Sequence, residues 1–173
     1  MRLIEYTAPP GTGKTTAAFL RVHQYKLARE KVEFIREVPQ VFLLDGRGDF
    51  GNGNQALYMG TYLKQVLNLK GMGYDTVICD SSFLTHLLYP DNIFKGELLT
   101  DMVESIYEYL HSIGVEVEIN ILPRNKARKF MPLGRHVNEA DCVEIQKNML
   151  QVVQDFKRKP ASKGVTFIET PEE

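Results

Sequence analysis

Short apolar runs alternate along the chain with longer segments in which apolar residues recur every three or four positions. The short runs predict β-strands, and the three-to-four-residue recurrence predicts amphipathic helices. We therefore expect strands over residues 3–7, 32–36, 76–79, 115–122 and 165–168. We expect helices over residues 14–30, 55–70, 97–112 and 139–157.

The helical spacing also predicts which side chains face the interior. In the first helix, the residues available to face a core are Ala17, Ala18, Leu20, Leu27 and Ala28. The later helices carry apolar stripes of their own, for example Met59, Leu63, Val66 and Leu67 in residues 55–70. Asn138 is expected to cap the helix over residues 139–157.

The alternation of strand and helix predicts an α/β fold, in which helices cover both faces of a parallel sheet. Residues 76–79 form an unbroken apolar or β-branched run, which is typical of a strand buried on both faces. Ligands of such sheets bind beyond the carboxyl ends of the strands. Functional residues are therefore expected after Tyr6, Ile35, Cys79 and Leu122.

Length and charge narrow the picture further. The chain has 173 residues, so we expect one domain over residues 1–173 with a sizeable core. The net charge of −1 argues against a global positive field for nucleic acid, although a local one stays open. Cys79 and Cys142 lie far apart in the sequence, and we expect both to be reduced thiols in the core. With neither a signal peptide nor a membrane span in view, we expect a cytoplasmic protein without a membrane partner.

A glycine-rich segment joins the first strand to the first helix. Residues 8–15 match the Walker A pattern G-x-x-x-x-G-K-[ST], except that Ala8 replaces the first glycine. The nucleotide-binding residues expected here are Pro10, Gly11, Thr12, Gly13, Lys14, Thr15 and Thr16. Lys14 would approach the β- and γ-phosphates of ATP, and Thr15 would ligate Mg²⁺. The alternative is a turn without a ligand, and Ala8 fits either case if its φ is negative.

Two carboxylates follow later strands. Asp80 ends the strand over residues 76–79, as in a Walker B segment, and would hold Mg²⁺ or its water shell. The alternative for Asp80 is a helix N-cap, shared with Ser81 and Ser82. Glu37 follows the second strand and would act as a catalytic base or bind a substrate hydroxyl. Its alternative is an ordinary solvated acid at a strand end.

Residues 123–138 are basic and predict a lid that closes over phosphates. The expected nucleotide contacts are Arg124, Arg128 and Arg135, with Arg128 also catalytic because a guanidinium can neutralise a transferring phosphoryl group. The alternatives are a solvated basic loop and a nucleic-acid patch.

A second substrate has candidate contacts in and after the glycine-rich loop over residues 45–54. They are Arg47, Gln55 and Tyr58, with Tyr62 one turn further along. A glutamine carboxamide pairs naturally with the edge of a nucleobase. The alternative is an ordinary loop, with both tyrosines in the core. The four histidines show no metal-like spacing, and we assign them no role.

With these residues in place, the chain resembles the P-loop nucleoside and nucleotide kinases, particularly small kinase-like proteins of bacteriophages. The likeness rests on residues 5–16, on residues 32–37 with the trailing Glu37, on residues 80–84 at an Asp-Ser or Asp-Arg position, and on Gly134-Arg135 with the helix that follows. The resemblance implies the three-layer P-loop NTPase fold, a five-stranded sheet in the order 2-3-1-4-5, and phosphoryl transfer from ATP.

These features predict a Mg²⁺-ATP-dependent kinase acting on a nucleoside, a nucleotide or a modified nucleobase. ATP and Mg²⁺ are its expected cofactors, and the host cytoplasm is its expected place if a phage encodes it. One alternative is a kinase for hydroxymethylated pyrimidines in phage DNA, with DNA as polymeric substrate. Another is a nucleotide-binding switch or weak ATPase that serves a partner protein.

Overall fold

The computed structural model describes residues 1–37, 55–88, 96–123 and 139–170. Its elements, including two 3-10 helices named η, follow in the order β1 (Arg2–Thr7), α1 (Lys14–Leu27), β2 (Val32–Ile35), α3 (Gln55–Gly71), β3 (Thr76–Cys79), η1 (Phe83–Leu88), α4 (Gly96–Ser112), β4 (Glu116–Ile121), α5 (Glu139–Lys157), η2 (Pro160–Gly164) and β5 (Val165–Glu169). Every predicted strand and helix is confirmed, with small shifts at the ends. The two 3-10 helices were not predicted.

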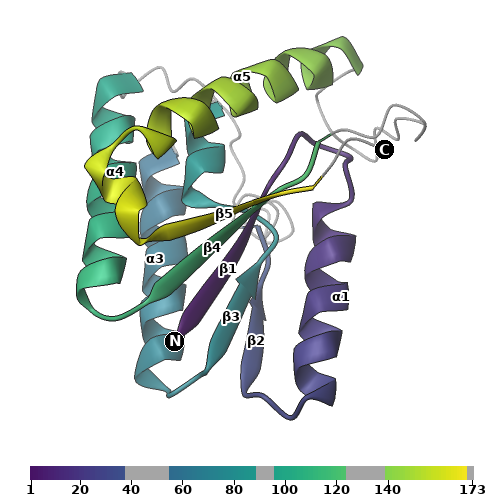
Figure 1. Ribbon diagram of the computed structural model, residues 1–173, viewed down its shortest axis with the longest axis vertical. Helices are drawn as coiled ribbons and strands as arrows, with labels where there is room; N and C mark the ends of the chain where they lie inside the picture. The colour runs from purple at the N-terminus through teal and green to yellow at the C-terminus, as the bar shows by residue number, and fades with distance from the viewer. Residues whose placement is uncertain (38–54, 89–95, 124–138, 171–173) are drawn as a thin grey trace.

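The five strands form one parallel sheet in the order β2-β3-β1-β4-β5 (Figure 1). The central strand β1 pairs with β3 on one side and β4 on the other, so that Ile4 lies opposite Ile78 and Glu118. The predicted parallel sheet and its strand order are therefore confirmed. All five strands end at the same edge, and the segments that leave this edge form the candidate site.

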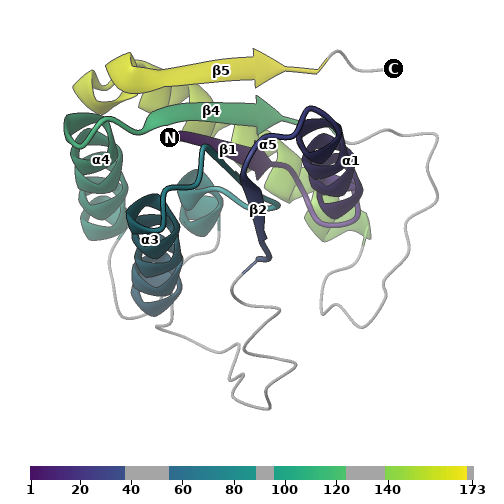
Figure 2. The same cartoon turned by 90° about the horizontal axis from the view of Figure 1, so that it is seen from below.

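Helices cover both faces of the sheet, as Figure 2 shows with α1 on one side and α3 and α4 on the other. Because successive strand residues point to opposite faces, β1 sends Leu3 toward α3 and α4, and Ile4 and Tyr6 toward α1. The larger core lies on the side of α3, α4 and α5. There the ring of Phe83 stacks on Tyr62 with centroids 4.4 Å apart and meets Tyr107 edge-on. The aromatic packing ties η1 to two helices.

The prediction for the buried face of α1 was wrong in part. Ala18 and Val22 are buried, whereas Leu20 and Leu27 are 61% and 71% exposed. Residues 18 and 22 lie one turn apart and fix the face that meets the sheet. Leu20 and Leu27 are off this face, because each residue turns the helix by about 100°. Apolarity alone could not select the correct stripe.

The same helix also ends earlier than predicted. Arg29 has a φ of 61°, in the left-handed region, and therefore cannot continue the helix. The amide of Glu30 donates to the carbonyl of Tyr25 at 3.1 Å, and that of Arg29 donates to Lys26 at 3.0 Å. These bonds satisfy carbonyls of the last turn.

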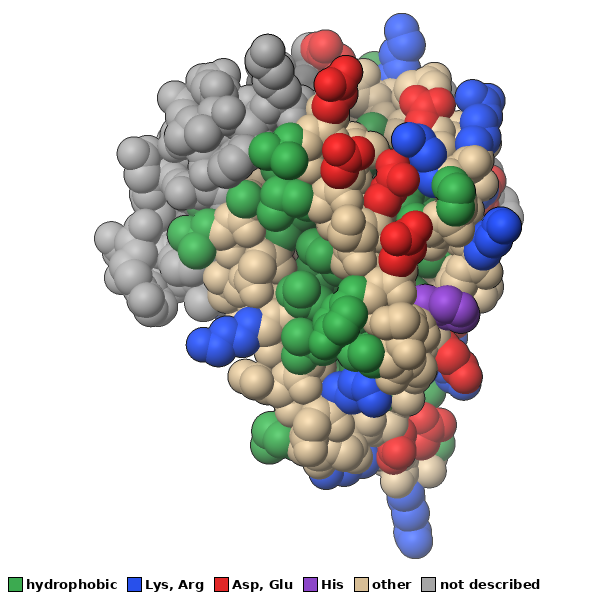
Figure 3. Space-filling view, turned by 90° about the vertical axis from the view of Figure 1, so that its left-hand side faces the viewer, with side chains coloured by type: hydrophobic (Ala, Val, Ile, Leu, Met, Phe, Trp, Pro, Cys, Tyr) green, Lys and Arg blue, Asp and Glu red, His purple; other side chains and the backbone are tan. Residues whose placement is uncertain are grey.

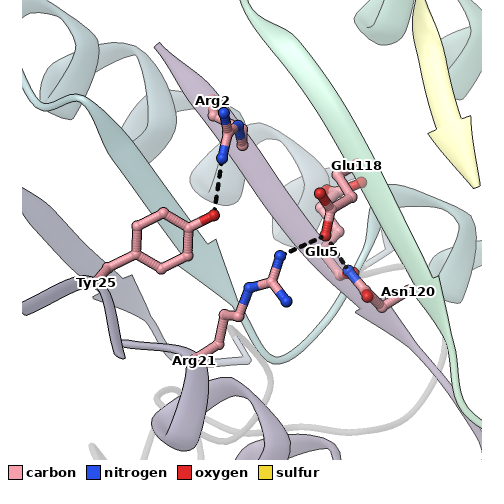
Figure 4. A network of polar contacts seen from close by, with 6 residues as sticks. All are labelled: Arg2, Glu5, Arg21, Tyr25, Glu118 and Asn120. Carbon is pink, nitrogen blue, oxygen red and sulfur yellow. Dashed lines mark hydrogen bonds and ion pairs between the residues drawn. The ribbon is translucent and has the colours of Figure 1, made fainter. Parts of the chain in front are cut away.

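Polar contacts join α1 to the sheet beside its apolar face (Figure 4). Arg21 lies 3.5 Å from the carboxylate of Glu118 on β4, which also accepts a hydrogen bond of 3.0 Å from Asn120. Arg2 donates to the hydroxyl of Tyr25 at 2.8 Å. Such partly exposed pairs contribute about 0–1 kcal/mol each. Through these contacts Arg21 and Tyr25 of α1 reach side chains of β4 and β1.

The outer face around α4 keeps several apolar side chains in solvent. Figure 3 shows hydrophobic side chains gathered near the middle of this face, next to acidic ones. Leu98 and Tyr109 of α4 and Leu57 of α3 are exposed. Within the described ranges, no helix has the length and apolarity required to cross a membrane.

Candidate functional site

The glycine-rich loop between β1 and α1 has the backbone shape that its sequence requires. Gly11 and Gly13 have φ angles of 79° and 93°, in the left-handed region that residues other than glycine rarely adopt. Ala8 is not among the described residues with positive φ, so alanine fits at this position. Thr12 Oγ1 donates to the carbonyl of Pro9 at 2.9 Å and holds the loop in a tight turn.

Gly13 is also the N-cap of α1, and its carbonyl accepts the amide of Ala17 at 2.9 Å. No side chain caps this helix, and its first turn, which is fully described, carries no acidic residue. The amides of a first turn carry partial positive charge. The helix start is therefore an electropositive position that can accept an anion, and no acidic residue of its own first turn competes for it.

Lys14 lies across this loop and is nearly buried. Its ammonium group donates to the carbonyl of Ala8 at 2.9 Å and lies 3.5 Å from that of Pro9. The ammonium group is thus held against the backbone of the loop that precedes α1. The role of Lys14 at the phosphates stays a prediction.

Thr15 and Asp80, predicted to share a metal, are in direct contact. Thr15 Oγ1 donates to Asp80 Oδ2 at 2.7 Å, across 65 positions of the chain. Asp80 is fully buried at the end of β3, and Thr15 lies in the first turn of α1. The parallel pairing of β1 with β3 brings these two segments to the same edge of the sheet.

The second oxygen of Asp80 holds the backbone after β2. The amide of Glu37 donates to Asp80 Oδ1 at 2.6 Å, so one carboxylate spans the helix start and the β2 segment. The predicted alternative, in which Asp80 caps a helix, does not apply. Ser82 has that role, because its hydroxyl accepts the amide of Thr85 at 3.2 Å at the start of η1.

Two serines follow Asp80 with different surroundings. Ser82 is hydrogen-bonded to the hydroxyl of Thr7 at the end of β1 and lies 3.1 Å from Thr85 Oγ1. Ser81 is only 4% exposed, yet its hydroxyl has no hydrogen-bond partner within the part of the chain that the structure describes. Burying a hydroxyl without a partner costs about 1–3 kcal/mol. Ser81 therefore leaves a donor and acceptor for a ligand or water beside Asp80.

The start of α3 contributes the acceptor-side candidates. Gln55 is half-buried, and its carboxamide oxygen lies 2.8 Å from Nδ1 of His86 on η1. Tyr58 and Tyr62 are buried in the larger core, as the alternative interpretation held. Tyr62 donates a hydrogen bond to Glu5 at 2.8 Å, which makes it a structural residue. A substrate role for Tyr58 stays a prediction.

Several predicted site residues lie outside the described residues. They are Arg47, Arg124, Arg128 and Arg135, together with the loop over residues 45–54, the remainder of the predicted lid after Pro123, and the cap Asn138. The structure brings together Lys14, Thr15, Asp80 and the backbone of Glu37.

Two residues of interest were missed. Glu5 is fully buried in β1 and accepts hydrogen bonds from Tyr62 and Tyr107, the latter at 2.7 Å. Burial raises the pKa of its carboxyl group to about 7, although the two tyrosines act in the opposite direction. The sequence did contain a signal for Glu5, because it is a charged residue in the middle of an otherwise apolar strand. His86 gave no such signal, because its contact with Gln55 is purely tertiary.

The site offers few protein ligands for a metal. Within the described ranges, no cluster of three or more His, Cys, Asp or Glu side chains could hold one. Thr15 and Asp80 supply a hydroxyl and a carboxylate, which are hard oxygen ligands of the kind that Mg²⁺ prefers. A magnesium ion at such sites takes its other ligands from water and substrate phosphates. The donor set therefore fits Mg²⁺ that arrives with a nucleotide.

The two cysteines, Cys79 and Cys142, are both buried and are not joined in a disulfide.

No protein-family model matches this sequence, and a comparison with curated proteins finds no match. The chemistry of the site itself is therefore the basis for a function.

Proposed function

We propose that the chain is a P-loop phosphotransferase, which moves the γ-phosphoryl group of Mg²⁺-ATP to a nucleoside, a nucleotide or a modified nucleobase. The contact of 2.7 Å between Thr15 Oγ1 and Asp80 Oδ2 is the observation that carries this proposal. It joins an acid at a strand end to a hydroxyl in the first turn of a helix, beside a glycine-rich loop and its lysine.

In this proposal the loop amides and Lys14 bind the β- and γ-phosphates. Thr15 and Asp80 would hold a magnesium ion, which would neutralise the charge that develops on the leaving group. Asp80 also accepts the backbone amide of Glu37 at 2.6 Å, which holds the segment after β2 next to the carboxylate that would bind the metal.

The transfer itself requires an acceptor oxygen in line with the bond that breaks. The acceptor hydroxyl oxygen forms a bond to the γ-phosphorus, and the bond from that phosphorus to the β–γ bridging oxygen breaks. ADP carries away the electron pair, and the hydroxyl proton passes to the carboxylate of Glu37 in this proposal. Lys14 stabilises the charge on the phosphates during the transfer.

The direct test is phosphoryl transfer from γ-labelled ATP. Purified protein and Mg²⁺ are incubated with nucleosides, deoxynucleoside monophosphates, and DNA with or without hydroxymethyluracil. We expect label on one class of acceptor. Lys14→Ala should lower the rate by about 100-fold or more, as the loss of a preorganised charge typically does.

A matched control is Lys26→Ala in the last turn of the same helix, which removes an equal charge at the far end. It should retain the wild-type rate. Label on DNA alone, with binding that falls steeply with salt, would favour the DNA kinase. ATP binding without label on any acceptor would refute the kinase and favour a nucleotide switch.

A further inference from the structure

The chain leaves the sheet at Asp80, directly after β3. The backbone pairing of β1 with β3 ends where Glu5 lies opposite Cys79, and Asp80 is the next residue along the chain. Strand pairing therefore fixes the position of β3 but not that of the segment that follows it. Side-chain contacts must help to determine where Asp80 lies relative to the glycine-rich loop.

Two side chains of β1 reach the segment after Asp80. Glu5 accepts a hydrogen bond from the backbone of Phe83, and the hydroxyl of Thr7 is hydrogen-bonded to that of Ser82. Both side chains point to the same face of the sheet, because successive residues of a strand alternate between its faces. Thr7 is 1% exposed and Ser82 is 0% exposed, so water does not compete for their contact.

The contact between these two hydroxyls links both halves of the candidate site. Thr7 is the last residue of β1, and the glycine-rich loop begins with the next residue, Ala8. Ser82 follows Asp80 by two positions and is itself held at the start of η1. There the amide of Thr85 donates to the hydroxyl of Ser82 at 3.2 Å, and the amide of Ser82 donates to that of Thr85 at 3.3 Å.

The position of Asp80 determines what Thr15 can offer to a metal. A threonine hydroxyl has one hydrogen to donate and two lone pairs on its oxygen. Thr15 Oγ1 donates this hydrogen to Asp80 Oδ2 at 2.7 Å, so the lone pairs of the same oxygen stay available. If Asp80 moved away, the hydroxyl of Thr15 would rotate and could direct its hydrogen toward the position of the metal.

We propose that Thr7 and Ser82 are positioning residues, whose hydroxyl contact keeps Asp80 next to Thr15 and thereby leaves the oxygen of Thr15 available to Mg²⁺. The inference rests on the proposed function and adds two residues to its metal site, neither of which touches the metal. It concerns how Mg²⁺ binds with the nucleotide and not which acceptor is used. Loss of the contact should therefore weaken nucleotide binding only when Mg²⁺ is present.

The experiment measures binding of a non-hydrolysable ATP analogue by calorimetry, once with saturating Mg²⁺ and once with EDTA. The dissociation constant in EDTA divided by that in Mg²⁺ gives the contribution of the metal, which we call the magnesium ratio. Thr7→Val keeps the branched shape of the side chain and removes its hydroxyl. It should lower the magnesium ratio by about 3- to 10-fold, the equivalent of one neutral hydrogen bond. Binding in EDTA should stay at the wild-type value.

Two further variants separate positioning from packing. Thr7→Ser restores the hydroxyl and should keep the wild-type magnesium ratio. Thr76→Val is the matched control at the start of β3, at the edge of the sheet opposite the candidate site. Thr76 is 2% exposed, and its hydroxyl donates to Glu30 at 3.3 Å, so this substitution also removes a buried, hydrogen-bonded hydroxyl. It should leave the magnesium ratio unchanged. Urea denaturation reports whether each variant is folded.

Ser82→Ala tests the same contact from its other side and replaces Thr7→Val if that variant does not fold. It should lower the magnesium ratio to a similar extent, and the double variant should lower it no further, because both changes remove one contact. An unchanged ratio in folded Thr7→Val or Ser82→Ala would overturn the inference, as would an equal fall in Thr76→Val. A wild type whose binding of the analogue does not depend on Mg²⁺ would overturn it as well.

The kinase and this inference can fail separately. A lower magnesium ratio in Thr7→Val, in a protein that labels no acceptor, would support the inference and refute the kinase. Phosphoryl transfer by the wild type, with an unchanged ratio in Thr7→Val, would support the kinase and overturn the inference.

Discussion

A buried carboxylate beneath the candidate site should make the stability of this protein depend on pH. Glu5 is 0% exposed in the central strand, and its oxygens accept hydrogen bonds from Tyr62 at 2.8 Å and Tyr107 at 2.7 Å. Desolvation raises the pKa of Glu5 from 4.5 to about 7. The folded protein therefore holds this proton over a range in which the unfolded chain has lost it.

The sign and the size follow from this difference in proton binding. Between pH 4.5 and about 7 the folded state binds more protons at Glu5, so the free energy of unfolding falls as pH rises and levels off above pH 7. Each unit of pKa difference corresponds to about 1.4 kcal/mol, which makes the total loss about 3 kcal/mol. Glu5→Gln, which is close in shape and does not ionise, should remove this loss.

The measurement is urea denaturation of wild type and Glu5→Gln at several pH values from 5 to 8. Over this pH range the difference between the two unfolding free energies should move by about 2.5 kcal/mol in favour of the variant. Burial lowers the pKa of His86 to about 4, so His86 changes stability in the opposite direction below pH 6.5. Both proteins retain His86, so its contribution cancels in the difference.

A surface variant, Glu108→Gln on the exposed face of α4, controls for the loss of one carboxylate. The reasoning would be refuted if the difference in free energy of unfolding between wild type and Glu5→Gln stayed constant from pH 5 to 8. It would mean that the buried carboxyl group ionises with the same pKa in the folded and unfolded states. An unchanged m-value is required throughout, because only then does the midpoint report stability alone.

Further predictions concern glycines and the shared carboxylate, and each is measured by urea denaturation. Gly60→Ala should stabilise the protein by about 0.5–1 kcal/mol, because a Cβ inside α3 meets nothing within 4 Å. Gly164→Ala should destabilise it by about 1–3 kcal/mol, because the new Cβ would lie 2.5 Å from Nδ1 of His111. The reverse order of these two variants would contradict the packing argument. Asp80→Ala should cost about 1–3 kcal/mol by leaving the Thr15 hydroxyl and a backbone amide without their acceptor, and Asp80→Asn should cost less. Equal losses for both Asp80 variants would show that these hydrogen bonds do not matter.

Much of the fold was predictable, because local patterns and topology rules agree for this chain. The apolar runs gave the positions of all five strands, and the strand–helix alternation implied a parallel sheet. The stripe on α3 was also correct, since Met59 and Val66 are buried and Leu63 and Leu67 pack against the same core. The stripe on α1 was not, because exposed Leu20 and Leu27 are as apolar as buried Val22, and only the neighbouring sheet decides which face it covers.

The candidate site divides in the same way. Its phosphate-binding half lies in one contiguous segment, residues 8–15, where the loop shape follows from the order of glycines, lysine and threonine. The pairing of Thr15 with Asp80 was expected because both follow adjacent parallel strands. The contact of the Glu37 amide with Asp80 was not expected, because a backbone donor leaves no mark in the sequence.

By itself the sequence determined the elements, the glycine-rich loop and the acid at the end of β3, because each depends on residues close together in the chain. Only the tertiary structure decided that Glu5 is held by two tyrosines and that His86 holds Gln55. These contacts join residues between 31 and 102 positions apart, and they form when helices pack against the sheet. Burial then changes the chemistry of the same side chains, because removal from water penalises the charged form of Glu5 and of His86.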